Sequence, residues 1–159
     1  PHPVATIVLA AGKGTRMKSR QPKVLHAIAG QPMLHHVLAT ARGLDPKRLV
    51  LVLGPNMEDV GAALPDGAPA AEIAVQTERL GTGHALLMAK PALAGFSGDV
   101  LVLYGDVPLI TAETLDALLA ARRSGAALAV LAGAVFTNID GAFCPTPKVY
   151  TQAAVNLVL

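Results

Sequence analysis

The sequence has a single cysteine, Cys144, among 159 residues, and it contains no tryptophan, two tyrosines and three phenylalanines. One cysteine cannot form an intramolecular disulfide, and without a Cys/His cluster at ligand spacing a zinc site is not expected. The few aromatic side chains predict an aliphatic core and exclude the stacking platforms on which single-stranded nucleic acid binds. We therefore expect no nucleic-acid partner.

Long apolar runs are also missing. Glycine, proline or a charged residue interrupts each run well before the ~18 residues that a membrane span requires, and no basic-then-apolar leader precedes them. Apolar residues nevertheless make up 52% of the chain and charged residues only 15%, which is not the composition of a disordered chain. We expect a folded cytoplasmic protein with no membrane partner.

Acidic side chains are absent from the first 44 residues, although the net charge of the whole chain is only +2. Residues 1–48 carry eight basic side chains and one acidic side chain, whereas residues 49–159 carry five basic and ten acidic ones. A basic run is usually a solvated face, but these cations gather around a glycine turn. That placement favours the binding of a compact anion such as phosphate.

Short aliphatic runs alternate with helical patterns along the chain. We expect strands at 4–9, 49–53, 72–77, 99–104 and 127–131, and helices over 33–41, 57–64, 84–90 and the segment between Thr111 and Gly125. Thr82 and Thr111 are expected to cap the last two helices. The alternation predicts right-handed β-α-β crossovers and an α/β fold, with a mostly parallel sheet between two helix layers.

In such a sheet a ligand binds outside the carboxyl ends of the strands. The first loop there holds Gly12 and Gly14 together with Lys13 and Arg16, and Lys23 ends it. Its backbone amides and cations can bind phosphate oxygens. The glycine spacing matches neither a Walker A loop nor a dinucleotide fingerprint.

Two further loops hold polar candidates. Asp106 follows the expected strand 99–104 and is suited to Mg²⁺, which uses one or two carboxylates with substrate phosphates and water; the alternative is an ordinary turn aspartate. Gln76 offers a donor and an acceptor to the edge of a nucleobase; the alternative is a surface glutamine. No arrangement suggests a side-chain nucleophile, so positioning and charge stabilisation remain as the expected chemistry.

Three ordered segments carry a resemblance to a known family: LAAGKGTRMKSRQPKVLHAIAGQPML (9–34), VQTERLGTGHA (75–85) and VLYGDVPLI (102–110). Together they resemble the nucleotidyltransferase domain of bacterial N-acetylglucosamine-1-phosphate uridylyltransferases, over about Val4 to Val130. The resemblance implies a Rossmann-like three-layer α/β/α nucleotidyltransferase fold. It also implies Mg²⁺-dependent transfer of a uridylyl group from UTP to N-acetylglucosamine 1-phosphate, with release of pyrophosphate.

The resemblance further implies residue roles. The uridine part would contact Leu9, Ala10, Ala11, Gly12 and Gln76, and the base would also contact Gly81 and Thr82. Arg16 and Lys23 would be catalytic, stabilising phosphate charge with Lys13. Tyr104 and Gly105 would line the sugar side, and Asp106 would bind Mg²⁺.

The resemblance does not extend over the whole chain. We expect a nucleotide-binding domain at 1–135, and residues 136–159 form an unassigned tail or a remnant of the sugar-binding part. The family's second metal ligand, an asparagine, cannot be placed here. Two alternatives stay open: a related nucleotidyltransferase with another base or sugar, and a nucleotide-binding fragment without turnover. A homo-oligomer is also possible.

Overall fold

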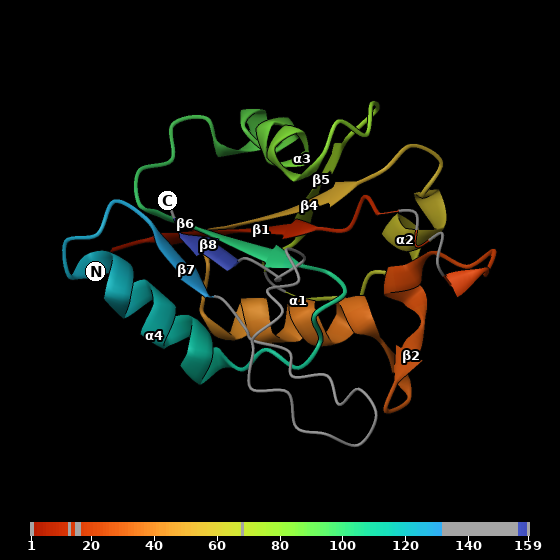
Figure 1. Cartoon of the computed structure of the whole chain (residues 1–159), viewed down its shortest axis with the longest axis horizontal. Coiled ribbons are helices and arrows are strands. Elements are labelled where there is room, and N and C mark those ends of the chain that lie inside the picture. Colours follow the sequence, from red (N-terminus) through yellow and green to blue (C-terminus); the bar gives the residue numbers. More distant parts are fainter. Residues whose placement is uncertain (1, 13, 15–16, 68, 132–155, 159) are drawn as a thin grey trace, which may run out of the picture.

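A six-stranded sheet with the strand order β5-β4-β1-β6-β8-β7 forms the centre of the molecule (Figure 1). The computed structural model describes residues 2–12, 14, 17–67, 69–131 and 156–158. Its strands are β1 (Val4–Leu9), β4 (Arg48–Leu53), β5 (Ala71–Val75), β6 (Asp99–Tyr104), β7 (Ala129–Leu131) and β8 (Asn156–Val158). The first four of these are parallel, and β8 pairs antiparallel with both β6 and β7. The prediction of a mostly parallel sheet is confirmed.

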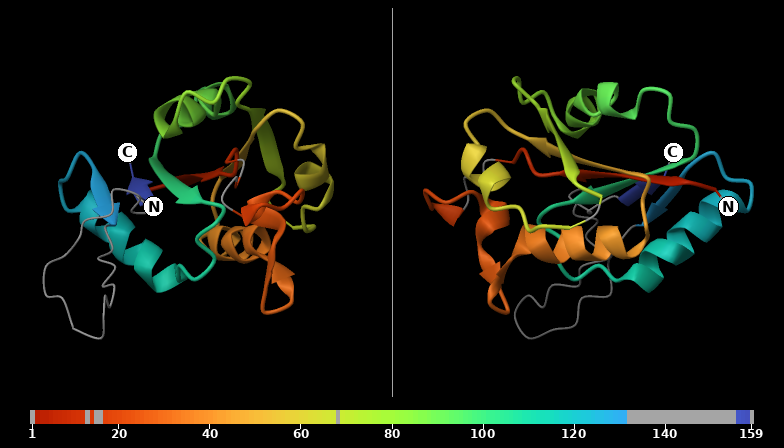
Figure 2. Two further views of the ribbon diagram at one scale, coloured as in Figure 1. Left: turned by 45° about the vertical axis from the view of Figure 1, so that its right-hand side comes forward. Right: turned by 180° about the vertical axis from the view of Figure 1, so that it is seen from behind.

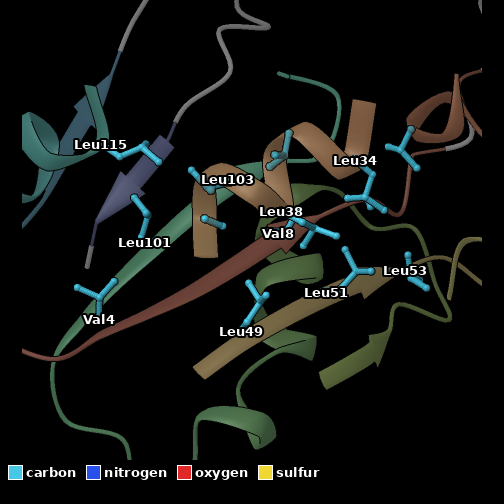
Figure 3. Close-up of a cluster of buried hydrophobic side chains, with 14 of the residues drawn as sticks. Val4, Val8, Leu34, Leu38, Leu49, Leu51, Leu53, Leu101, Leu103 and Leu115 are labelled. Atoms are coloured by element: carbon cyan, nitrogen blue, oxygen red, sulfur yellow. The ribbon is translucent and has the colours of Figure 1, made fainter. Parts of the chain in front are cut away.

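Strand β1 is buried along its whole length because it lies between β4 and β6. The register sets Val8 opposite Leu51 on one side and opposite Leu103 on the other. These three side chains belong to one core cluster on the same face of the sheet (Figure 3). The predominantly apolar sequence of β1, interrupted only by the buried Thr6, is therefore explained by burial on both faces.

Helices cover both faces of the sheet, as the views in Figures 1 and 2 agree. The helices are α1 (Met33–Gly43), α2 (Glu58–Ala62), α3 (Thr82–Met88) and α4 (Ala112–Arg123), with 3-10 turns η2 (Lys23–Leu25) and η3 (Pro91–Leu93). Helices α1 and α4 bury Leu38 and Leu115 in the cluster of Figure 3. Helix α3 buries Ala85, and the residue that follows the helix, Ala89, is buried with it against the opposite face. The predicted three-layer α/β/α architecture is confirmed.

Some local predictions differ from the structure. Thr111 caps α4 as predicted, accepting a hydrogen bond from Thr114 N at 3.3 Å. Thr82 does not cap α3, because the cap position is Gly81, whose φ of 101° suits glycine. The hairpin of β2 (Ala27–Ile28) and β3 (Gln31–Pro32), and the strand β8, were not predicted. None of the helices within the described ranges is long and apolar enough to cross a bilayer.

A buried carboxylate fixes the amino end of β6, opposite to the end that carries Asp106. The Asp99 side chain is 5% exposed, and it accepts a hydrogen bond at 2.6 Å from Arg123 Nε of α4. Arg122 Nε lies 4.0 Å from the other carboxylate oxygen. Because Arg123 also donates to the His2 carbonyl, this cluster joins α4, β6 and the start of the chain.

Candidate functional site

A pocket of about 260 Å³ opens where β1, β5 and β6 end. It brings together the three loops that the sequence analysis singled out. Its lining residues are Leu9, Ala10, Ala11, Gly12, Lys23, Val24, Gln76, Arg79, Gly81, Thr82, Ala85, Tyr104 and Asp106. Parallel strands present their carboxyl ends at one edge, so loops far apart in sequence meet there.

Backbone hydrogen bonds fix the start of the first loop just beyond β1. Ala10 N donates to Val52 O at 2.8 Å, and Gly105 N donates to Leu9 O at 2.9 Å. These bonds continue the sheet ladder by one step on each side of β1. Gly12 follows, exposed, and among the residues that the structure describes, its chain neighbours aside, an added Cβ there would meet no atom within 4 Å. The backbone at Gly12 is therefore open to close approach by a ligand.

Gly14 packs directly on Lys23, which fixes the far end of the same loop. Gly14 has a φ of 61°, and a Cβ on it would lie 2.7 Å from the Cβ of Lys23. Both the left-handed conformation and the crowding exclude a larger side chain without displacement of Lys23. Lys23 can therefore occupy its observed position only because residue 14 is a glycine.

Lys23 and Asp106 form an ion pair across the pocket. Lys23 Nζ donates to Asp106 Oδ2 at 2.7 Å, and the two side chains are 40% and 33% exposed. An ion pair with this much solvent contact contributes little to stability and separates readily when another ligand competes for either partner. The cation suited to a phosphate and the carboxylate suited to a metal therefore lie side by side.

Gln76 is the buried polar residue of the pocket, with only 3% of its surface exposed. Its backbone N donates to Leu53 O at 2.8 Å. Its side-chain Nε2 donates to Gly81 O at 3.0 Å and lies 3.2 Å from His84 Nδ1. When His84 Nδ1 is the unprotonated ring nitrogen, both amide protons are engaged and the amide oxygen is left to accept from a ligand.

Arg79 lines the pocket and was not assigned a role from the sequence. Its Nε donates to Ala11 O at 3.0 Å, so it ties the loop after β5 to the loop after β1. Arg79 stands inside the segment 75–85 that the resemblance rests on. A cation in a loop at the carboxyl end of a parallel strand was the signal that could have identified it.

The remaining predicted residues divide into three groups. Thr82 and Tyr104 line the pocket. Gly105 is buried beside it, where an added Cβ would lie 3.3 Å from atoms of Ala10, Leu34 and Val24 rather than in the cavity. Lys13 and Arg16 lie outside the described residues.

The donor set suits a divalent cation that brings most of its own ligands. Within the described ranges, no group of three or more His, Cys, Asp or Glu side chains could hold a metal ion by itself. Asp106 supplies one carboxylate at the pocket, and Mg²⁺ is commonly held by one or two carboxylates with phosphate oxygens and water. A metal that arrives with a polyphosphate fits this site.

Comparisons with known proteins show the family to which the chain belongs. Residues 6–140 match the model of the MobA-like NTP transferase domain. The bifunctional protein GlmU of Paramagnetospirillum magneticum is 59% identical over 120 residues, which are 76% of this chain and 26% of that protein. The chain therefore spans about a quarter of the length of this curated relative.

Solved structures share the fold. A UDP-glucose pyrophosphorylase from Acinetobacter baumanii superposes with a TM-score of 0.72 at 18% identity, covering 99% of this chain and 74% of that one. Rv0371c from Mycobacterium tuberculosis H37Rv, solved in complex with manganese, has a TM-score of 0.62 at 23% identity, covering 77% of this chain and 60% of that one. With most of its residues matched by the family model, the chain belongs to the MobA-like NTP transferase domain family.

Proposed function

We propose that the chain transfers a uridylyl group from UTP to N-acetylglucosamine 1-phosphate, giving UDP-N-acetylglucosamine and pyrophosphate. The observation that carries the proposal is the single pocket in which Leu9–Gly12, Lys23, Gln76 and Asp106 meet. The identity to a GlmU protein supports the same reaction. The cytoplasm, which supplies nucleoside triphosphates, is the compartment we propose.

The base would bind between Gln76 and the start of α3. The uracil N3–H can donate to the amide oxygen of Gln76, whose orientation is fixed by its bonds to Gly81 and His84. The exposed backbone of Gly81 and Thr82 lies beside it for a carbonyl of the base. The segment Leu9–Gly12 would pack against the rest of the uridine.

The phosphates would lie along the glycine loop, where the chain gathers its cations. Lys23 would leave Asp106 and donate to the phosphates, together with Lys13 and Arg16, to stabilise the charge of the transition state. A phosphate oxygen of the sugar phosphate attacks the α-phosphorus in line. The bond from the α-phosphorus to the bridging oxygen breaks, and pyrophosphate leaves on the opposite side.

Asp106 would hold a divalent cation, which we propose to be Mg²⁺. The cation would supply charge neutralisation on the phosphate oxygens when bound. Tyr104, which lines the pocket beside Asp106, and the adjoining Gly105 would border the sugar. No side chain needs to act as a nucleophile, and the chain's own contribution is to orient the two substrates.

Pyrophosphate release tests the proposal. The chain is assayed with Mg²⁺ and each of UTP, CTP, GTP and dTTP, in combination with N-acetylglucosamine 1-phosphate and other sugar 1-phosphates. Fastest turnover with UTP and N-acetylglucosamine 1-phosphate is expected. Preference for another pair would assign the chain to a related nucleotidyltransferase, and binding of UTP without product would make it a nucleotide-binding fragment.

A further inference from the structure

Arg79 contacts the backbone just beyond the point where the pairing of β1 with β4 ends. The last bond of that ladder is Ala10 N to Val52 O at 2.8 Å. One residue later, the Ala11 carbonyl accepts from Arg79 Nε at 3.0 Å, while Gly54 N at the end of β4 donates to Met57 Sδ instead. A side chain from the loop after β5 thus holds the backbone of β1's loop just beyond the point where its pairing with β4 ends.

Gly54 makes room for this contact. An added Cβ on Gly54 would collide with Arg79 Nη2 and would lie 3.1 Å from Ala11 O. The guanidinium therefore lies over the backbone of Gly54 while it reaches Ala11. Its planar shape suits a narrow gap and a directed hydrogen bond at the same time, which an ammonium group does not.

The contact sets the spacing between two walls of the pocket. Arg79 follows Gln76 by three residues, and the buried Gln76 is fixed to Leu53 through its backbone N. Ala11 lines the same pocket from the loop after β1. Arg79 consequently joins the wall formed by the loop after β1 to the wall formed by the loop after β5.

We propose that Arg79 is a positioning residue for the nucleotide, which sets the width of the base and ribose subsite by holding the Ala11 carbonyl. The inference rests on the proposed function of the pocket as a nucleotide site. It assigns Arg79 to the base and ribose side and not to the phosphates, which have the cations of the glycine loop.

This role predicts a particular pattern of binding losses. Arg79→Gln keeps a polar side chain but removes the guanidinium, and Arg79→Lys keeps the charge without the planar fork. Both variants should weaken UMP and UTP by the same factor, about 10-fold, because the altered subsite is common to both ligands. If Arg79 contacted the phosphates, these substitutions would weaken the binding of UTP more than that of UMP. They would also weaken the binding of inorganic pyrophosphate.

Gly54→Ala gives a second variant that leaves Arg79 in the sequence. The added methyl group would force Nη2 away and so loosen the bond to Ala11. The expected losses of UMP and UTP affinity match those of Arg79→Gln. The two changes together should weaken binding little more than either one alone, because they disrupt the same contact.

Isothermal titration calorimetry measures the affinities for UMP, for UTP plus Mg²⁺ and for pyrophosphate. Circular dichroism checks that each variant folds. Arg48→Gln is the matched control, since Arg48 also donates to a backbone carbonyl, that of Ala92, at the other end of β4. Equal losses for UMP and UTP in the Arg79 and Gly54 variants, with pyrophosphate and the control unchanged, support the inference. Unchanged UMP affinity in the variants overturns it alone, whereas a wild-type chain that binds neither UMP nor UTP overturns the proposed function as well.

Discussion

Lys23 Nζ lies 2.7 Å from Asp106 Oδ2, although 83 positions separate the two residues in the sequence. The pair connects the end of the glycine loop with the end of β6 across the mouth of the pocket. In the proposed reaction each partner has a different ligand, phosphate for the lysine and a metal for the aspartate. The ion pair must therefore separate when both ligands bind.

Lys23→Met should tighten the binding of a divalent cation to the chain without nucleotide. The substitution removes both a competitor for Asp106 Oδ2 and a nearby positive charge. Because an ion pair with this exposure contributes little free energy, its loss should raise the affinity of Asp106 for the cation by roughly 2- to 5-fold. Mn²⁺ titration followed by electron paramagnetic resonance measures it. Lys47→Met is the control, because Lys47 also forms an ion pair with an aspartate. Its Nζ lies 3.2 Å from Asp45 Oδ2, and neither residue lines the pocket. Unchanged or weaker Mn²⁺ binding would speak against competition at Asp106.

Gly14→Ala should lower turnover by more than about 10-fold, since charge-stabilising contacts contribute several kcal/mol in a transition state and the new Cβ would push Lys23 out of place. It should also cost about 1 kcal/mol of unfolding free energy from the positive φ. Gly95→Ala separates the two effects, because Gly95 has a φ of 72° but, apart from its chain neighbours, no atom of the described part of the chain lies within 4 Å of an added Cβ. Equal activity in the two variants would remove the packing of Gly14 on Lys23 from the account.

Gln76→Ala should reduce the preference for UTP over CTP by at least about 10-fold, because an amide that reads a base edge is lost from a buried site. The bond from Gln76 to Gly81 disappears with it, so the start of α3 also loses a fixed contact. Ratios of kcat/KM for the two nucleotides measure the effect, and Gln31→Ala on the exposed β3 is the control. A UTP preference that survives the substitution would place base recognition elsewhere.

Asp99→Asn should lower the free energy of unfolding by about 2 kcal/mol and leave nucleotide binding unchanged. Loss of one partner from a buried pair usually costs about 3–5 kcal/mol, and the partial exposure of both arginines reduces that figure. Urea denaturation measures the change. Asp45→Asn, in which the aspartate side chain is 89% exposed, should have almost no effect. A comparable loss in both variants would contradict a special role for the buried Asp99.

The sequence predicted the sheet well where burial determines the pattern. The bounds of β1 and β6 were predicted to the residue, because both strands are short, mostly aliphatic runs that end at polar or glycine-rich loops. The site followed from the topology, since parallel strands bring 9–12, Gln76 and Asp106 to one edge. Residue types at strand ends were informative even though no single motif was decisive.

Other features depend on tertiary contacts that leave little trace in the sequence. Strand β8 pairs with β6, which lies more than 50 residues earlier in the sequence, as well as with β7. Because β8 has only three residues, it has no distinctive sequence pattern. The bond from Arg79 to Ala11 depends on the space above Gly54. The pairing of Lys23 with Asp106, in turn, follows only from the folded positions of two separate loops.

A crystal structure of the chain with UTP and Mg²⁺ tests the central claim most directly. The account predicts the uracil against Gln76, the triphosphate along the glycine loop with Lys23 turned toward it, and the metal on Asp106. A triphosphate bound away from the glycine loop, or a metal that does not contact Asp106, would contradict it.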